Sequence, residues 1–283
     1  MAAALFAAAI GGAWSGAAEA GTMDRLKQDK AIRIAFREDA PPFSFKDDKG
    51  QPAGFMVELC RDVAKGLSDQ LGGGALDTRF VPVTATTRFD AIENGQADLL
   101  CEATTATLSR RAHVDFSIAT YVDGASVLVR TDGPIDFAAL KGRKIGVLAG
   151  TTTQEELDNS LQDAGITAEV VPVTSHAEGL AMLDRAAISA YFADRAILAF
   201  LASRSAAPQN LALANNFLTV EPYALALPRG DQDFRLAVDR ALSRIYRSDE
   251  INQVFKRSFG TSVAGAQGSG LLQTLYTISA LPE

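Results

Sequence analysis

The sequence has few of the residues on which metal, thiol and nucleic-acid chemistry depend. Its 283 residues include two His, two Cys and one Trp. Two His provide little for a zinc site or a Cys–His catalytic pair, and neither Cys60 nor Cys101 has the spacing of a metal ligand. The net charge is −7 and no block of Lys or Arg occurs, which argues against a nucleic-acid partner. We therefore expect no metal, no cofactor and no nucleic acid.

Long apolar runs and the common enzyme motifs are also missing. After residue 20, no run of eighteen apolar residues occurs that would span a membrane. The sequence contains no P-loop, no G-x-S-x-G elbow and no H-E-x-x-H motif. The composition is that of an ordinary globular protein, 47% apolar and 22% charged, and the chain is long enough for two domains.

Residues 1–20 have the pattern of a signal peptide. A short apolar stretch ends in Ala18-Glu19-Ala20, which resembles an A-x-A cleavage site. We predict export of the protein, the alternative being a structural N-terminal helix. In an exported protein a pair of cysteines suggests one disulfide, between Cys60 and Cys101. The alternative is two buried reduced thiols.

Strand-like segments alternate with helical patterns along the chain. Residues 31–36 alternate like a strand, and apolar residues at helical spacing follow over 55–67. The same succession returns at 144–148 and 153–164. This order predicts an α/β fold with largely parallel sheets.

Three further patterns concern helices. Thr152 with Glu155, and Ser175 with Glu178, fit the capping box that opens a helix. Helix starts of this kind present free N–H groups and hold anions. Beyond a linker at 265–270, an apolar face is expected to dock on the body. That face consists of Leu271, Leu272, Leu275, Tyr276 and Ile278.

Several motifs occur in the order found in one known family. Ile32 to Phe55 reads I-R-I-A-F-R-E-D-A-P-P-F-S-F-x-x-x-x-G-x-x-x-G-F, and a T-x-T-x-x-R segment ending at Arg110 precedes D-F-S at 115–117. Gly150-Thr151-Thr152 and Asp194 follow. Over residues 30–260 the chain resembles the type-3 bacterial solute-binding proteins, which bind amino acids for ABC transporters. Its motifs are most similar to those of glutamate/aspartate-binding members.

The resemblance implies an α/β fold of two lobes joined by a hinge, the type II periplasmic-binding-protein fold. It assigns 22–121 and 222–260 to lobe one and 122–221 to lobe two, with 261–283 as a linker and docked tail. The chain is then expected to cross between the lobes near 122–124 and near 220–222.

The resemblance also implies a site for an amino-acid head group. Arg110 would grip the α-carboxylate, helped by N–H groups near Thr105 and Thr152, because a guanidinium donates two parallel hydrogen bonds to a carboxylate. Asp194, the hydroxyl of Thr105 and the carbonyl of Ala103 would receive the α-ammonium. The alternatives are a surface salt bridge for Arg110 and a helix N-cap for Asp194.

Three more residues match positions that face the ligand side chain in glutamate/aspartate-binding members. They are Arg37, Arg88 and His176, and a helix N-terminus would keep His176 neutral. Two departures bear on the ligand. Ala40 replaces a common aromatic residue. Glu102 replaces a common Gly, and if it points inward it would disfavour a second carboxylate.

Local ion pairs are the alternative interpretation of these arginines. Arg37 would then pair with Glu38, and Arg88 with Asp90 or Glu93. Under the site interpretation the two arginines and a neutral imidazole suit an acidic ligand.

We therefore expect a periplasmic, monomeric substrate-binding component of an amino-acid ABC importer, which binds a polar and acidic amino acid by hinge closure and catalyses nothing. Its partners would be the amino acid and an ABC permease in the inner membrane. One alternative is an enzyme on the same fold, similar to cyclohexadienyl dehydratase. Another is a soluble sensor partner of a signalling receptor.

Overall fold

The computed structural model describes residues 21–133, 136–214, 217–259 and 270–283. The predicted signal peptide at 1–20 and most of the predicted linker at 265–270 lie outside these residues. Within the described ranges, no helix is both long enough and apolar enough to cross a membrane.

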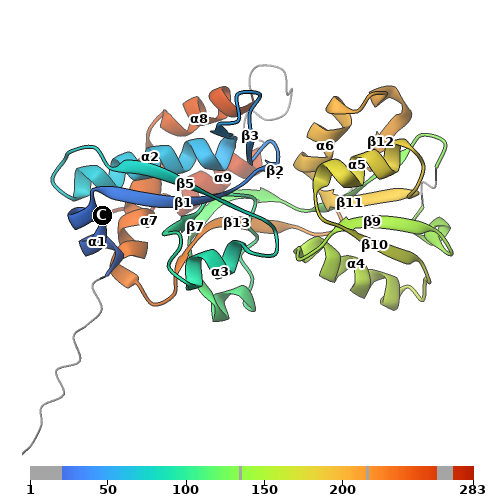
Figure 1. The fold of residues 1–283 in the computed structure, drawn as a ribbon, viewed down its shortest axis with the longest axis horizontal. Coiled ribbons are helices and arrows are strands. Elements are labelled where there is room, and N and C mark those ends of the chain that lie inside the picture. Colours follow the sequence, from blue (N-terminus) through green and yellow to red (C-terminus); the bar gives the residue numbers. More distant parts are fainter. Residues whose placement is uncertain (1–20, 134–135, 215–216, 260–269) are drawn as a thin grey trace, which may run out of the picture.

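The chain forms two lobes that lie side by side along the long axis of the molecule (Figure 1). The first lobe is built on a five-stranded sheet in the order β5-β1-β6-β13-β7. β1 is parallel to β5 and β6, whereas β13 is antiparallel to β6 and β7. The strands are β1 (Ala31–Arg37), β5 (Asp77–Val83), β6 (Leu99–Leu100), β7 (Val114–Asp123) and β13 (Glu221–Pro228).

Both faces of this sheet are covered. Because successive strand residues point to opposite faces, Ile34 joins the apolar cluster under α2, whereas Ala35 joins the cluster under α3. The helices of this lobe are α1 (Thr22–Asp29), α2 (Phe55–Gln70), α3 (Arg88–Glu93), α7 (Gln232–Arg247), α8 (Glu250–Phe259) and α9 (Gly270–Ser279).

The second lobe repeats the plan with a sheet in the order β10-β9-β11-β8-β12. Its strands are β8 (Ala125–Arg130), β9 (Lys144–Leu148), β10 (Glu169–Val173), β11 (Ala190–Asp194) and β12 (Leu211–Leu213), and its helices are α4 (Thr152–Asp163), α5 (His176–Asp184) and α6 (Arg195–Arg204). β9 is parallel to β10 and β11, and β8 is antiparallel to β11 and β12. The predicted α/β fold of two lobes is confirmed.

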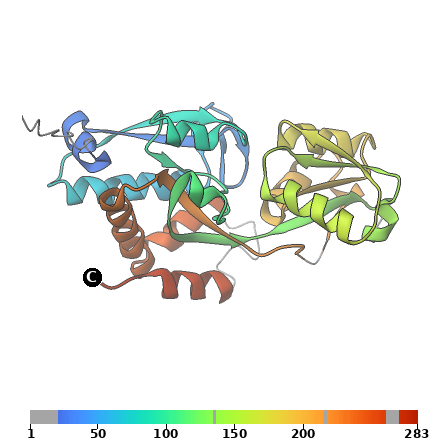
Figure 2. The same ribbon diagram turned by 90° about the horizontal axis from the view of Figure 1, so that it is seen from below.

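Two extended segments connect the lobes (Figure 2). β7 ends at Asp123 and continues into β8 through Gly124, and β13 begins at Glu221 beside it. A Cβ at Gly124 would collide with the backbone carbonyl of Thr219. Gly124 therefore allows the two connecting segments to approach each other closely.

A small three-stranded sheet, β2-β3-β4, follows β1. Its strands are β2 (Asp39–Ala40), β3 (Ser44–Lys46) and β4 (Pro52–Ala53), with a cis peptide bond between Pro41 and Pro42. β2 lies against α5 of the second lobe. Strands of two or three residues are too short to show alternation in the sequence, and this sheet was not predicted.

The C-terminal helix α9 packs on β7 and α7 with one narrow stripe. Leu272 and Tyr276 are buried, and the Tyr276 hydroxyl donates to the carbonyl of Thr120 at 3.1 Å. Leu271 and Ile278 are exposed, so the expected five-residue apolar face is too wide. A helix that rests on a sheet buries only the residues three or four apart that face it.

Candidate binding site between the lobes

A small cavity lies where the two lobes meet. It encloses about 20 Å³, roughly one water-sized sphere. Its wall includes all eight residues that the sequence analysis assigned to a ligand: Arg37, Arg88, Ala103, Thr105, Arg110, Thr152, His176 and Asp194. Leu148, Thr151, Thr153, Phe192, Ala193 and Ile197 complete it. The structure thus brings the eight residues together, and their contacts with a ligand remain a prediction.

Strand ends and helix starts position these side chains. Arg37 ends β1, Arg88 opens α3 and Arg110 opens a short 3-10 helix, all in the first lobe. In the second lobe His176 opens α5, and Asp194 ends β11.

Arg110 lines the cavity and has no carboxylate partner among the described residues. Its Nη1 donates to the carbonyl of Thr105 at 2.8 Å, and the guanidinium lies 5.3 Å from the ring centroid of Phe89. It forms no ion pair with any residue of the described ranges, so the surface salt bridge considered above is not present. A guanidinium can donate two parallel hydrogen bonds to a carboxylate.

Asp194 faces the cavity from the second lobe. Its Oδ1 accepts a hydrogen bond from the Thr153 hydroxyl at 3.1 Å, and its Oδ2 accepts one from the Tyr223 hydroxyl at 2.5 Å. Asp194 occupies the N-cap position of α6, but its side chain does not cap the helix. Burial, followed by the negative charge of Glu221, raises the pKa of Asp194 to about 6.

Two further carboxyl groups behind Asp194 were missed in the sequence. Glu221 accepts from the hydroxyls of Thr105 and Thr152, at 2.5 and 2.8 Å, through the same Oε2. Asp123 is 5% exposed, and burial followed by the charge of Asp194 raises its pKa to about 8. Asp123 and Glu221 lie in the segments 122–124 and 220–222, where the chain is expected to cross between the lobes. An acidic residue in such a segment is the sequence feature that could have identified them.

The predicted capping box at Thr152 is displaced by one residue. Thr151 is the N-cap of α4, and its hydroxyl oxygen accepts from the N–H of Gln154 at 3.3 Å. The Thr152 hydroxyl is therefore free to face the cavity. The second predicted helix start is as expected, since Ser175 caps α5 through the N–H of Glu178 at 3.1 Å.

Arg37 is paired with Asp39. Nε and Nη2 of Arg37 lie 3.0 and 2.6 Å from the same Oδ1, and the Arg37 side chain is 3% exposed. The alternative pairing with Glu38 is wrong, because Glu38 pairs with Lys46. Asp39 also reaches the second lobe, where its Oδ2 accepts from the N–H of His176 at 3.4 Å.

Arg88 is paired with Glu102, at 3.5 Å between Nε and Oε1. Both side chains are almost completely buried, and burial lowers the pKa of Arg88 to about 10, so that it remains a cation at neutral pH. Pairing with Asp90 or Glu93 is not observed. Glu102 is therefore buried beside Arg88 but is not among the residues that line the cavity, and its Oε2 has no hydrogen-bond partner among the described residues.

His176 is neutral at physiological pH. Burial, followed by the charge of Arg37, lowers its pKa to about 3. The expected direction is confirmed, but burial rather than the helix terminus is the main cause. Nδ1 lies 2.8 Å from the hydroxyl of Tyr191, whose ring packs so closely that a Cβ at Gly179 would collide with it.

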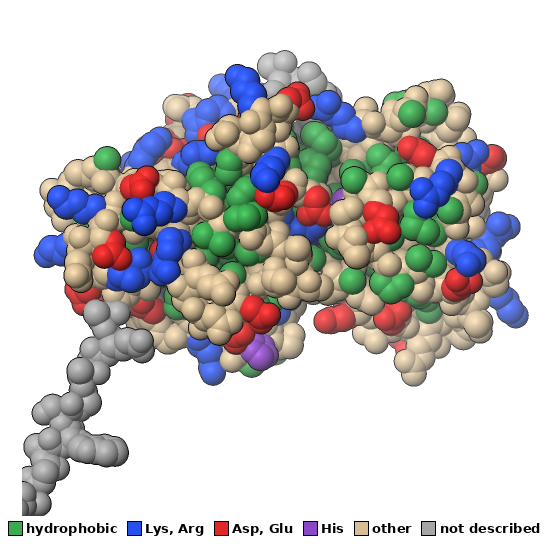
Figure 3. Space-filling view, in the orientation of Figure 1, with side chains coloured by type: hydrophobic (Ala, Val, Ile, Leu, Met, Phe, Trp, Pro, Cys, Tyr) green, Lys and Arg blue, Asp and Glu red, His purple; other side chains and the backbone are tan. Residues whose placement is uncertain are grey.

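The lobes touch through the polar residues of the site. The Arg88 guanidinium donates to the carbonyl of Gly150 at 3.3 Å, and the hydroxyls of Thr105 and Thr152 are 3.3 Å apart. On the face shown in Figure 3, acidic and basic side chains lie next to one another where the lobes meet. The surfaces that form the cavity are therefore in direct contact with each other.

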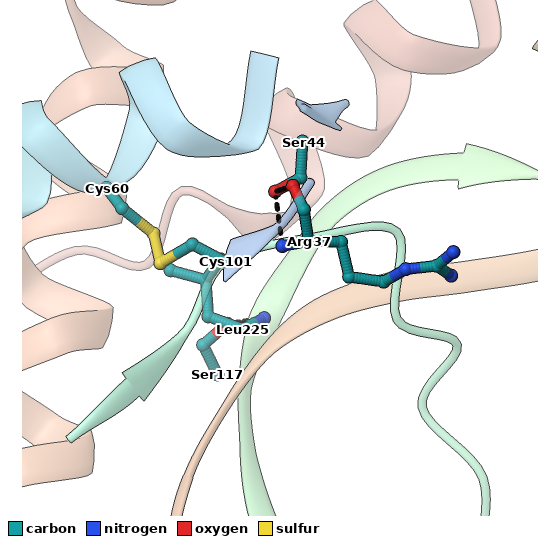
Figure 4. Close-up of a disulfide and its surroundings, with 6 residues drawn as sticks. All are labelled: Arg37, Ser44, Cys60, Cys101, Ser117 and Leu225. Carbon is teal, nitrogen blue, oxygen red and sulfur yellow. Dashed lines mark hydrogen bonds between the residues drawn. A yellow bond between two sulfur atoms is a disulfide. The ribbon is translucent and has the colours of Figure 1, made fainter. Parts of the chain in front are cut away.

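A disulfide between Cys60 and Cys101 supports the site, as predicted (Figure 4). It joins α2 to the residue after β6, with 6.3 Å between the Cα atoms. Glu102 and Ala103 follow immediately. Arg37 points away from the disulfide, and its N–H donates to the Ser44 hydroxyl at 2.9 Å (Figure 4).

Comparison with known proteins gives consistent relatives. The L-glutamate/L-aspartate-binding protein of Pseudomonas aeruginosa is 28% identical over 241 residues, covering 84% of this chain and 80% of that protein. A glutamate/aspartate import solute-binding protein of Salmonella typhimurium is 26% identical over 254 residues, covering 89% and 84%.

Solved structures share the fold. The solute receptor for L-cysteine of Neisseria gonorrhoeae superimposes with a TM-score of 0.77 at 24% identity, covering 89% of this chain and 98% of that one. An ancestral amino acid-binding protein, described as a precursor of cyclohexadienyl dehydratase, has a TM-score of 0.73 at 25% identity, covering 85% and 100%. The sequence model of one family matches residues 32–261. The chain belongs to the bacterial extracellular solute-binding proteins, family 3.

Proposed function

We propose that this protein is the periplasmic substrate-binding component of an amino-acid ABC importer, and that its ligand is a polar amino acid with an acidic side chain. The observation that carries the proposal is the pairing of opposite charges across the cavity. Arg110 on the first lobe has no carboxylate partner in the described ranges, and Asp194 on the second lobe has no cationic one. An α-carboxylate and an α-ammonium supply the two missing charges.

Binding then works by closure of the lobes. The cavity lies between the lobes and is lined by residues of both, so we infer that a ligand enters when the lobes separate. A ligand held by Arg110 and Asp194 bridges the lobes and therefore binds the closed form more tightly than the open form. The connecting segments at Gly124 and Glu221 are the places where such a motion would be absorbed. A membrane permease would recognise the closed form.

The acidic side chain is assigned on two supports. Arg37, Arg88 and His176 line the same cavity as Arg110 and Asp194 and are the cationic or hydrogen-bonding groups there that the head group does not use. The relatives from Pseudomonas aeruginosa and Salmonella typhimurium are named for glutamate and aspartate. These relatives are binding proteins, and we propose no catalysis for this chain.

Native mass spectrometry of the purified protein, followed by isothermal titration with single amino acids, tests the proposal. Arg110→Ala and Asp194→Ala should each weaken binding by about 2–5 kcal/mol, because each leaves the opposite charge of the ligand unpaired in a desolvated site. Arg111→Ala is the matched control, since Arg111 is the neighbouring residue but does not line the cavity. Full affinity in either of the first two variants would show that the site is misplaced.

A further inference from the structure

Arg37 and Arg88, the two arginines that the proposed function assigns to the ligand side chain, each have a carboxylate partner within the protein. Arg37 is held by Asp39, with both of its contacting nitrogens on a single carboxylate oxygen at 3.0 and 2.6 Å. Arg88 is held by Glu102, whose side chain is completely buried. The two arginines are therefore charge-balanced inside the protein. A ligand carboxylate near these arginines meets two ion pairs rather than two free cations.

The arginine that the proposed function assigns to the α-carboxylate differs from these two. Arg110 has no carboxylate partner in the described part of the chain, and its hydrogen bond goes to the neutral carbonyl of Thr105. The cavity therefore offers one uncompensated guanidinium, which one carboxylate satisfies. A second ligand carboxylate must compete with a protein carboxylate for a guanidinium.

We propose that Asp39 and Glu102 are specificity-determining residues, whose charges reduce the preference of the site for acidic over amide side chains. This inference rests on the proposed function and deepens it. Neutralising either residue frees one guanidinium. The carboxylate of an acidic ligand forms a stronger, charge-assisted hydrogen bond with this guanidinium than the amide of a neutral ligand does.

Asp39 and Glu102 act in different ways. The Asp39 side chain is 28% exposed, and its Oδ2 also accepts a long hydrogen bond from the first residue of α5. A ligand carboxylate would compete with Asp39 for both Arg37 and this helix terminus. Glu102 is enclosed, with Oε1 near Arg88 and accepting from the Thr104 hydroxyl, and with Oε2 unpartnered among the described residues. Glu102 is thus a fixed negative charge that a second ligand carboxylate must approach.

The experiment is a titration of glutamate and glutamine into the wild type, Asp39→Asn and Glu102→Gln. The measured quantity is the ratio of the two dissociation constants, Kd for glutamine over Kd for glutamate. We expect this ratio to rise at least tenfold in Asp39→Asn and to rise in Glu102→Gln. Glu38→Gln is the matched control. It removes a negative charge next to Asp39 in the sequence, but Glu38 pairs with Lys46 and neither residue lines the cavity. Its ratio should equal that of the wild type.

The outcomes separate this inference from the proposed function. An unchanged or smaller ratio in Asp39→Asn, with both ligands still bound, overturns the inference and leaves the proposed function standing. If the wild type binds none of glutamate, glutamine, aspartate and asparagine, the proposed ligand class is wrong and the inference fails with it. If Glu102→Gln does not fold, the titration of Asp39→Asn still tests the inference, because Asp39 is partly exposed and its replacement is less disruptive.

Discussion

Asp123 and Glu221 face each other across the antiparallel pair β7–β13, at the point where the chain passes between the lobes. Both are about 5% exposed, and the charge of Asp194 raises the pKa of Asp123 further. Like charges this close in a buried site cannot all be ionised without cost. Asp123, where the chain passes between the lobes, therefore retains a proton that a solvated carboxyl group would release.

This proton retention predicts how stability depends on pH. An unfolded Asp ionises near pH 4, whereas the pKa of Asp123 is raised to about 8. Between these values the folded protein binds more protons than the unfolded chain, so its free energy of unfolding falls as pH rises from about 4 to about 8. Asp123→Asn should reduce this slope and gain stability relative to the wild type at pH 8. Urea unfolding at several pH values measures the slope.

Asp115→Asn is the control for this measurement, because Asp115 lies at the other end of β7 and accepts from the N–H of Gly230. It should leave the slope unchanged. An identical slope in the wild type and in Asp123→Asn would show that Asp123 is ionised in the folded protein.

A second prediction concerns ligand affinity and follows from the proposed function. The pKa of Asp194 is raised to about 6, and a bound ammonium favours its carboxylate form. Binding should therefore release a proton near pH 6, and affinity should fall below that pH by at most about tenfold per pH unit. Titration in two buffers of different ionisation enthalpy measures the released proton directly.

Glu221 provides the internal check on this linkage. Its negative charge is the second cause of the raised pKa of Asp194. Glu221→Gln should therefore move the midpoint of the affinity curve to lower pH, while its amide oxygen can still accept from the two threonine hydroxyls. An affinity that stays constant between pH 5 and 8 would contradict the prediction.

The residues that line the cavity could be predicted from the sequence, whereas the carboxylate partners of Arg37 and Arg88 could not. Arg110 and Asp194 belong to recognisable local patterns, a T-x-T-x-x-R segment and an acid at a strand end. The alternative to a ligand contact for Arg37 was an ion pair with Glu38, the next residue. In extended chain, residues two apart point to the same side, so Asp39 was the better choice by geometry.

The pairing of Arg88 with Glu102 is a harder case. Arg88 opens a helix, and Glu102 lies after the following strand, so no helical or strand periodicity relates them. Only the packing of α3 beside β6 brings them together. Similarly, Asp123 and Glu221 meet because two distant segments cross between the lobes. Non-local contacts of this kind leave no signature in one sequence.

A third prediction concerns the buried pair itself. Arg88→Ala leaves Glu102 enclosed without its cation, which should lower the free energy of unfolding by about 3–5 kcal/mol. Replacing both residues, as Arg88→Met with Glu102→Leu, removes the charge and fills similar space. The double variant should recover most of that loss. Urea unfolding of the wild type, the single variants Arg88→Met and Glu102→Leu, and the double variant completes a mutant cycle, and simple additivity of the two single changes would contradict direct coupling.

The last prediction concerns the disulfide that precedes the binding segment. Cys60 and Cys101 are 41 residues apart and fully buried, and their bond ties α2 to the chain just before Glu102. Removing the loop closure with Cys60→Ala and Cys101→Ala together should lower the free energy of unfolding by about 4 kcal/mol, because the unfolded chain gains conformational entropy. Reducing agent should destabilise the wild type by a similar amount and leave the double variant unchanged, which separates loop closure from the loss of two buried sulfur atoms. Thiol titration of the wild type in denaturant without reductant should find no free thiol. Two reactive thiols there would show that the cysteines are reduced and that the segment is held by packing alone.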